Sequence, residues 1–182
     1  MKKRNTSIVF AVFIFSCASL YGQSFLSAGA SLGGGTIKGN SPAQTSYTSS
    51  VFIETEMPFV RDASLRISFL YAADINSILP DNRIIYTPSI KGISLKTIVR
   101  QPLQDKFYLE EGIGILLLND RTFSDTNVLD FGAAASFLGG IDFRNEINVK
   151  GFRFGAGVEY GLTFTNTLAG YISFHLQGEY CF

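Results

Sequence analysis

A strict alternation of apolar and polar residues along the final segment, 170–182, constrains the fold more than any other feature. From position 172 onward the even positions are apolar or small, and from 173 the odd positions are Ser, His, Gln, Glu and Cys. Successive side chains of a strand point to opposite faces, so the segment predicts a strand with one apolar and one polar face. It ends on Phe182, with Tyr180 two places before it. This pattern favours an apolar face that meets lipid in a closed barrel, and removal of Phe182 is expected to impair membrane assembly.

Seven earlier segments show the same alternation, each about 12–16 residues long, which exceeds the usual strand of globular proteins and suffices to cross a membrane at a tilt. They are 24–37, 45–57, 63–74, 89–100, 106–118, 129–144 and 149–164. No stretch of the chain after the first 22 residues approaches the roughly 20 apolar residues of a spanning helix. The sequence therefore predicts an all-β fold, an eight-stranded antiparallel up-and-down transmembrane β-barrel.

The connections alternate between long and short. The longer ones are polar loops at 38–44, 75–88 and 119–128, and the shorter ones are turns at 58–62, 101–105 and 145–148. All five prolines fall in these connections or at a strand margin, where a missing N–H does no damage. Long outer loops and short periplasmic turns are typical of outer-membrane barrels, and an even number of strands places both ends of the barrel on the periplasmic side.

The first 22 residues are predicted to be a signal peptide, with residues 23–182 forming the barrel domain. A basic start at 2–4, an apolar run at 8–15 and a small-residue exit at 18–22 carry this prediction. Cleavage after Ala18, or lipoprotein processing at Cys17, are the alternatives. Removal of the signal leaves 12 basic and 15 acidic residues, a net charge of −3 that does not favour nucleic acid. Cys181 is then the only cysteine, so no internal disulfide is expected.

Outward-facing aromatic residues are expected to gather at the two membrane interfaces. The expected periplasmic group is Phe107, Phe143, Phe152, Tyr180 and Phe182, and the expected outer group is Tyr47, Tyr71, Phe131 and Phe164. Glu111 does not fit, because an unbroken register places its carboxylate on the lipid face. Either a bulge turns this residue inward or it lies close to the periplasmic interface.

These features together resemble the outer membrane β-barrel domain family, which includes the OmpX-like barrels and the transmembrane part of OmpA. The resemblance rests on the aromatic end of the last strand, on the run Gly151–Gly161 and on eight strands behind a signal peptide. It implies insertion by the barrel assembly machinery. It implies no single activity, since such barrels serve as structural proteins, adhesins, narrow pores and a few lipid-modifying enzymes.

Any chemistry would lie in the lumen, to which the charged side chains of the polar faces point. The inward charges are Arg66, Lys96, Arg100, Arg153, Glu54, Glu56, Glu110, Asp142, Glu159 and Glu179. The interior of an eight-stranded barrel is just wide enough for side chains to fill, and unpaired buried charges are costly. We therefore expect a plug of ion pairs and hydrogen bonds, with a selective pore or proton path as the alternative.

His175, the only histidine, is expected on the polar face of the last strand near Glu159. A His–carboxylate pair could form half of a catalytic triad, but a packed lumen histidine is the favoured interpretation. No glycine-rich phosphate loop is present, and the acidic residues of 119–130 do not match a calcium loop and indicate a solvated surface loop. We predict no catalytic, cofactor-binding or metal-binding residue.

The predicted function is that of an integral outer-membrane barrel with a polar, side-chain-plugged lumen and surface loops, in a structural or interaction role and without enzymatic activity. The expected partners are outer-membrane lipids and lipopolysaccharide and the barrel assembly machinery, and the expected state is a monomer. The alternatives are a small channel or hydrophobic-ligand carrier, and a lipid-modifying enzyme. A soluble lipocalin-type barrel, with its apolar face inward, is the rival fold.

Overall fold

The computed structural model describes residues 26–57, 60, 63–78, 86–104, 106–123, 127–144 and 150–182. The predicted signal peptide, the turn at 145–148 and most of the turn at 58–62 lie outside these residues. In the part of the chain described, no helix is long and apolar enough to cross a membrane.

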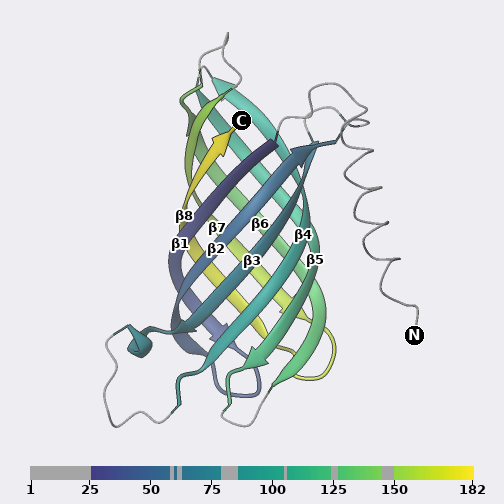
Figure 1. The fold of residues 1–182 in the computed structure, drawn as a ribbon. Helices are drawn as coiled ribbons and strands as arrows, with labels where there is room; N and C mark the ends of the chain where they lie inside the picture. Colours follow the sequence, from purple (N-terminus) through teal and green to yellow (C-terminus); the bar gives the residue numbers. More distant parts are fainter. Residues whose placement is uncertain are drawn as a thin grey trace, which may run out of the picture.

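Eight antiparallel strands close into a single barrel, as predicted (Figure 1). Each strand pairs with its neighbours in the chain, and β1 pairs with β8 to complete the closure. The strands are β1 Leu26–Lys38, β2 Gln44–Glu56, β3 Ala63–Asp74, β4 Ser89–Gln104, β5 Phe107–Arg121, β6 Val128–Asp142, β7 Gly151–Thr163 and β8 Gly170–Cys181. Closure leaves no unpaired edge, so every strand exchanges main-chain hydrogen bonds on both sides.

The two ends of the barrel differ. At one end, which we call the turn end, β1 begins and β8 finishes, and the β2–β3, β4–β5 and β6–β7 connections lie there (Figure 1). The other end, the loop end, holds the remaining four connections. The longest of these contains a short 3-10 helix, η1 (Ile75–Ser77), where the carboxylate of Asp74 accepts a hydrogen bond from the Asn76 N–H at 2.8 Å.

Two predicted boundaries were wrong, both at β4 and β5. The segment 101–104 was expected to be a turn, but it continues β4, with Pro102 opposite Tyr108 and a register shift between Pro102 and Gln104. A bulge of this kind lets a proline without an N–H remain in a ladder. The loop expected from 119 begins later, because residues 119–121 still pair with β4. The polar composition of both stretches concealed their pairing.

The outer wall of the barrel is apolar. Leu32, Ile113 and Leu176 are each 69% exposed, and large hydrophobic residues are exposed along all eight strands. This orientation is the reverse of the rival lipocalin-type barrel. Glu111 also faces outward, since it lies between Val99 and Phe137 in an unbroken register. The bulge considered for Glu111 is therefore absent from this part of the ladder.

Aromatic rings contact one another near both ends of the outer wall. At the turn end, the rings of Phe152 and Tyr180 lie 4.9 Å apart and those of Tyr180 and Phe182 lie 5.2 Å apart. At the loop end, the rings of Tyr47 and Tyr71 lie 6.0 Å apart. These contacts agree with the two predicted aromatic groups. Such rings stabilise the position of a protein at lipid headgroup level.

Candidate functional site: the barrel interior

The strand register places opposite charges side by side on the inner wall near the turn end. Glu54 on β2 lies opposite Arg66 on β3, and Arg100 on β4 lies opposite Glu110 on β5. On the other side of the barrel, Arg153 on β7 lies between Asp142 on β6 and Glu179 on β8. Directly opposed cross-strand pairs of opposite charge stabilise a sheet. The alternation of positive and negative side chains on neighbouring strands is therefore encoded in the sequence. Closure of the barrel brings the charges of β2–β5 close to those of β6–β8.

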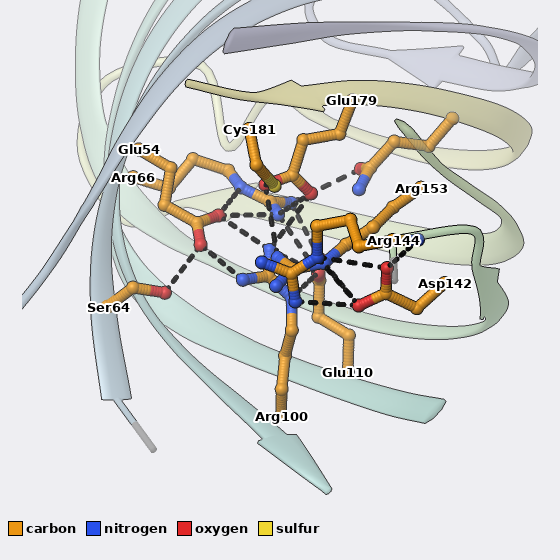
Figure 2. Close-up of polar contacts among 11 residues, drawn as sticks. Glu54, Ser64, Arg66, Arg100, Glu110, Asp142, Arg144, Arg153, Glu179 and Cys181 are labelled. Atoms are coloured by element: carbon orange, nitrogen blue, oxygen red, sulfur yellow. Dashed lines mark hydrogen bonds and ion pairs between the residues drawn. The ribbon is translucent and has the colours of Figure 1, made fainter. Parts of the chain in front are cut away.

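Inside the barrel, near the turn end, Arg66 and Arg100 bind three carboxylates (Figure 2). Arg66 nitrogens lie 2.7 Å from a Glu54 oxygen and 2.7 Å from a Glu110 oxygen. Arg100 nitrogens lie 2.6 Å from Glu54, 2.9 Å from Glu110 and 3.0 Å from Glu179. All three glutamates and Arg66 are buried. Each guanidinium therefore bridges strands that are not neighbours in the sheet.

The cluster extends toward the turn end through Arg153. Its guanidinium lies 3.4 Å from Glu179 and 3.1 Å from Asp142, and Asp142 also lies 2.6 Å from Arg144. We call the eight connected residues the charge network: Glu54, Arg66, Arg100, Glu110, Asp142, Arg144, Arg153 and Glu179. Four carboxylates balance four guanidiniums, so the charge network is neutral. Neutrality and charge-assisted hydrogen bonds together offset the cost of removing these groups from water.

The oxygens of Glu54, Glu110 and Glu179 lie within 4.8 Å of one another, a spacing compatible with a metal ion. Arg66 and Arg100 occupy the space that such an ion would need. Both arginines bind carboxylate oxygens at hydrogen-bond distance, so a cation would have to displace a guanidinium. The chemistry of this donor set is that of an internal salt-bridge network.

A second polar group lies halfway along the lumen. The Lys96 ammonium lies 2.5 Å from one oxygen of Glu159, and the Tyr171 hydroxyl donates to the other oxygen at 2.5 Å. His175 is buried opposite Gly157, two residues along the strand from the Glu159–Ser173 pair. Ser173 on β8 hydrogen-bonds Thr48 on β2, over the intervening strand β1. The expected proximity of His175 to Glu159 is present in the register. Glu159, however, is engaged by Lys96 and Tyr171.

An apolar cluster lies in the half of the lumen nearest the loop end, which the prediction of a polar lumen did not include. Buried side chains from six strands and from the β7–β8 connection pack together here, namely Ile37, Ala72, Ile90, Leu116, Leu118, Ala134, Ala169 and Tyr171. The sequence does hold a signal for this cluster. Residues 115–118 of β5 are apolar at every position, as expected of a strand buried on one face and exposed to lipid on the other.

Two buried aspartates hold the loops against this apolar cluster. Asp120 accepts hydrogen bonds from the Thr122 N–H at 2.8 Å and from the Asn40 N–H at 3.1 Å, which links the β1–β2 connection to β5. Asp130 accepts from the N–H groups of Asn166 and Thr167, each at 2.9 Å. Both aspartates are fully buried. The prediction that the acids of 119–130 are solvated is therefore wrong for these two.

The inward positions predicted from alternation are confirmed for nine of the ten charged residues, which face the lumen. Glu56 follows the same parity but lies exposed at the rim, one pair of residues beyond Glu54. The prediction missed Phe52, whose ring lies 4.2 Å from the Arg66 guanidinium carbon. It also missed Tyr108, which is buried near the charge network. Both follow the inward parity of their strands, but aromatic residues had been sought only on the lipid face.

Comparison with known proteins gives matches at the level of fold. No protein-family model matches the chain. No curated protein matches it either. Among solved structures, Neisserial surface protein A (NspA) superposes with a TM-score of 0.62 at 8% identity, covering 87% of this chain and 97% of that one. Ail, the attachment invasion locus protein of Yersinia pestis, superposes with a TM-score of 0.52 at 12% identity, covering 88% and 99%. At these identities the likeness shows the fold, and it confirms the expected resemblance to small eight-stranded outer-membrane barrels.

Proposed function

We propose that this chain, which has the fold of the small outer-membrane barrels, is an integral outer-membrane protein with a structural or interaction role. Its lumen is plugged and its loop end faces the exterior. One observation carries the proposal: large hydrophobic residues are exposed along all eight strands, while ion pairs and an apolar cluster pack inside the barrel. A wall of this kind is stable only in contact with lipid.

The filled interior argues against transport as the main role. The charge network lies in the turn-end half of the lumen, and the apolar cluster lies toward the loop end. Ions crossing the barrel would have to separate guanidinium–carboxylate pairs and then pass the apolar cluster. The residues available for interaction are therefore those of the loops and of the outer wall.

Cell fractionation combined with gel mobility tests location and fold together. The protein is expected in the outer-membrane fraction. Unheated samples should migrate differently from boiled samples, because a closed barrel resists detergent unfolding. Recovery in buffer without detergent would overturn the membrane assignment. A barrel that is found only in the inner-membrane fraction would overturn the location.

Planar-bilayer recordings test the plugged lumen. We expect no steady conductance from the folded protein, and unchanged behaviour for Arg153→Ala, which loosens only one side of the charge network. A reproducible conductance that Arg153→Ala abolishes or alters would favour the small channel instead. A change in lipid A mass on expression, lost in His175→Ala, would favour a lipid-modifying enzyme.

A further inference from the structure

We propose that a groove on the outer wall, extending from β3 to β6, binds an acylated membrane lipid whose phosphate-bearing headgroup has a net negative charge. This inference rests on the proposed function, because it requires the barrel to lie in a membrane with its loop end at the headgroup level. It goes further by naming a site on the wall and the chemistry of its ligand.

The groove is an apolar depression of about 370 Å³ that ends at a polar edge. Its apolar part is formed by one row of register partners, Phe69, Ile93 and Leu117. Its polar edge is the next row toward the loop end, Tyr71, Lys91 and Asn119, which also pair across the three strands. Apolar and polar parts therefore follow one another along the strands toward the loop end, as tail and headgroup do in a lipid.

The polar edge carries positive charge. The Lys91 ammonium lies 5.9 Å from the centroid of the Tyr71 ring, so it is held over an aromatic face. Arg121 is the next outward residue of β5 beyond Asn119, lies opposite Ser89 and is exposed. Among the described residues that line the groove, none carries a carboxylate. The edge is thus complementary to an anion, and a phosphate group is the anion that lipid headgroups supply.

Tyr71 sets the depth of this edge. It belongs to the aromatic group at the loop end and contacts Tyr47, and tyrosines in such positions lie at the level of lipid headgroups. Lys91 lies directly opposite Tyr71 in the ladder, and its ammonium lies over the Tyr71 ring, so the cation is close to this edge. A phosphate at Lys91 and Arg121 would leave its acyl chain free to follow the apolar row of Phe69, Ile93 and Leu117.

A second groove provides an internal comparison. It is larger, about 640 Å³, and crosses β1, β6, β7 and β8. Small residues such as Gly139 and Ala156 form it, with Phe137 and Phe174 at its sides. Its lining contains no lysine and no arginine, and its one titratable residue is His175, which is buried on the lumen face. This groove can take up lipid tails but has no exposed cation for an anionic headgroup, so charge distinguishes the two sites.

Lipid competition in native mass spectrometry tests the proposal. The folded barrel is presented with phosphatidic acid and phosphatidylcholine of identical chains. Two cations near a membrane surface should favour phosphatidic acid about tenfold or more. The Lys91→Gln/Arg121→Gln double variant should lose most of this preference. The matched control is Lys38→Gln, which removes an exposed cation from the loop end of β1 and should keep the preference.

Two further arms separate a lipid site from a simple anion site. Ile93→Trp fills the apolar part while leaving both cations, and it should weaken phosphatidic acid binding severalfold. Inorganic phosphate at millimolar concentration should not displace the lipid. Displacement by phosphate, equal binding of the two lipids, or an equal loss in Lys38→Gln would each overturn the proposal.

Failure here can be distinguished from failure of the proposed function. Every variant is first checked for outer-membrane location and for the mobility difference between boiled and unboiled samples. Variants that pass both checks but show no lipid preference overturn the lipid site alone. A wild-type chain that fails these checks overturns the proposed function.

Discussion

Replacement of Arg66 by methionine removes one guanidinium from the charge network and leaves its partners in place. The Arg66 side chain lies 2.7 Å from Glu54 and 2.7 Å from Glu110, and it donates to Gln177 at 3.2 Å. Its guanidinium also lies over the Phe52 ring. Methionine fills part of the volume but donates no hydrogen bond, so the charge network changes from neutral to a net charge of −1.

The expected loss of stability is large because the orphaned carboxylates stay buried. Removal of one partner from a buried ion pair destabilises proteins by about 3–5 kcal/mol, and Arg66 serves two carboxylates at contact distance. The second substitution in Arg66→Met/Glu54→Gln restores neutrality. We expect the double variant to recover about 1–3 kcal/mol relative to the sum of the single variants, as is typical of residues in one network.

Urea unfolding of the barrel in phospholipid vesicles measures these differences, followed by far-ultraviolet circular dichroism and gel mobility, since the chain contains no tryptophan. Glu56→Gln is the matched control, because Glu56 is an inward-parity glutamate of the same strand that lies exposed at the rim. It should change the free energy of unfolding by less than about 1 kcal/mol. A loss in Arg66→Met no larger than that of the control, or strict additivity in the double variant, would refute the reasoning.

Three further predictions concern the wall and the loops. Gly140→Ala should destabilise the barrel by about 1–3 kcal/mol, because a Cβ atom at this position would lie 2.6 Å from a β7 carbonyl oxygen. Gly139→Ala should be near neutral, since the nearest atom to its Cβ would be 3.8 Å away. Urea unfolding compares the two variants. Glu111→Leu should raise the free energy of unfolding by less than about 2 kcal/mol in the same assay, by removing a lipid-facing carboxylate; a decrease would contradict the outward orientation. Asp130→Ala should cost about 1–3 kcal/mol, because it leaves several part-buried donors such as the Thr167 N–H unpaired. It should also increase proteolytic cleavage at 164–169; unchanged cleavage would show that Asp130 does not hold this connection.

Much of the barrel could be predicted from alternation alone. Because side chains of a strand alternate between two faces, one apolar position such as Ile67 places Arg66 and Ser68 inside without any knowledge of the neighbours. The same rule placed the charged residues of the lumen. It failed at 101–104, where polar residues and Pro102 read as a turn although the ladder continues past them.

The partners inside the lumen could not be predicted in the same way. Alternation gives a direction for each side chain but no height along the barrel axis, and contacts across the lumen depend on the stagger of all eight strands. Arg66 meets Glu110, two strands away, and Glu159 is engaged by Lys96 from the far wall. The apolar cluster near the loop end had only one local signal, the all-apolar run 115–118, because its members come from six strands and one connection.

By itself, the sequence determined the number of strands, the face on which each residue lies and the difference between the two ends, because these follow from local periodicity and from the length of the connections. Only the tertiary structure decided that no bulge turns Glu111 inward, that Asp120 and Asp130 are buried anchors, and that four arginines balance four carboxylates in one network. The physical reason is closure. When β8 pairs with β1, residues far apart in the chain share one narrow interior, where a buried charge without a partner is costly.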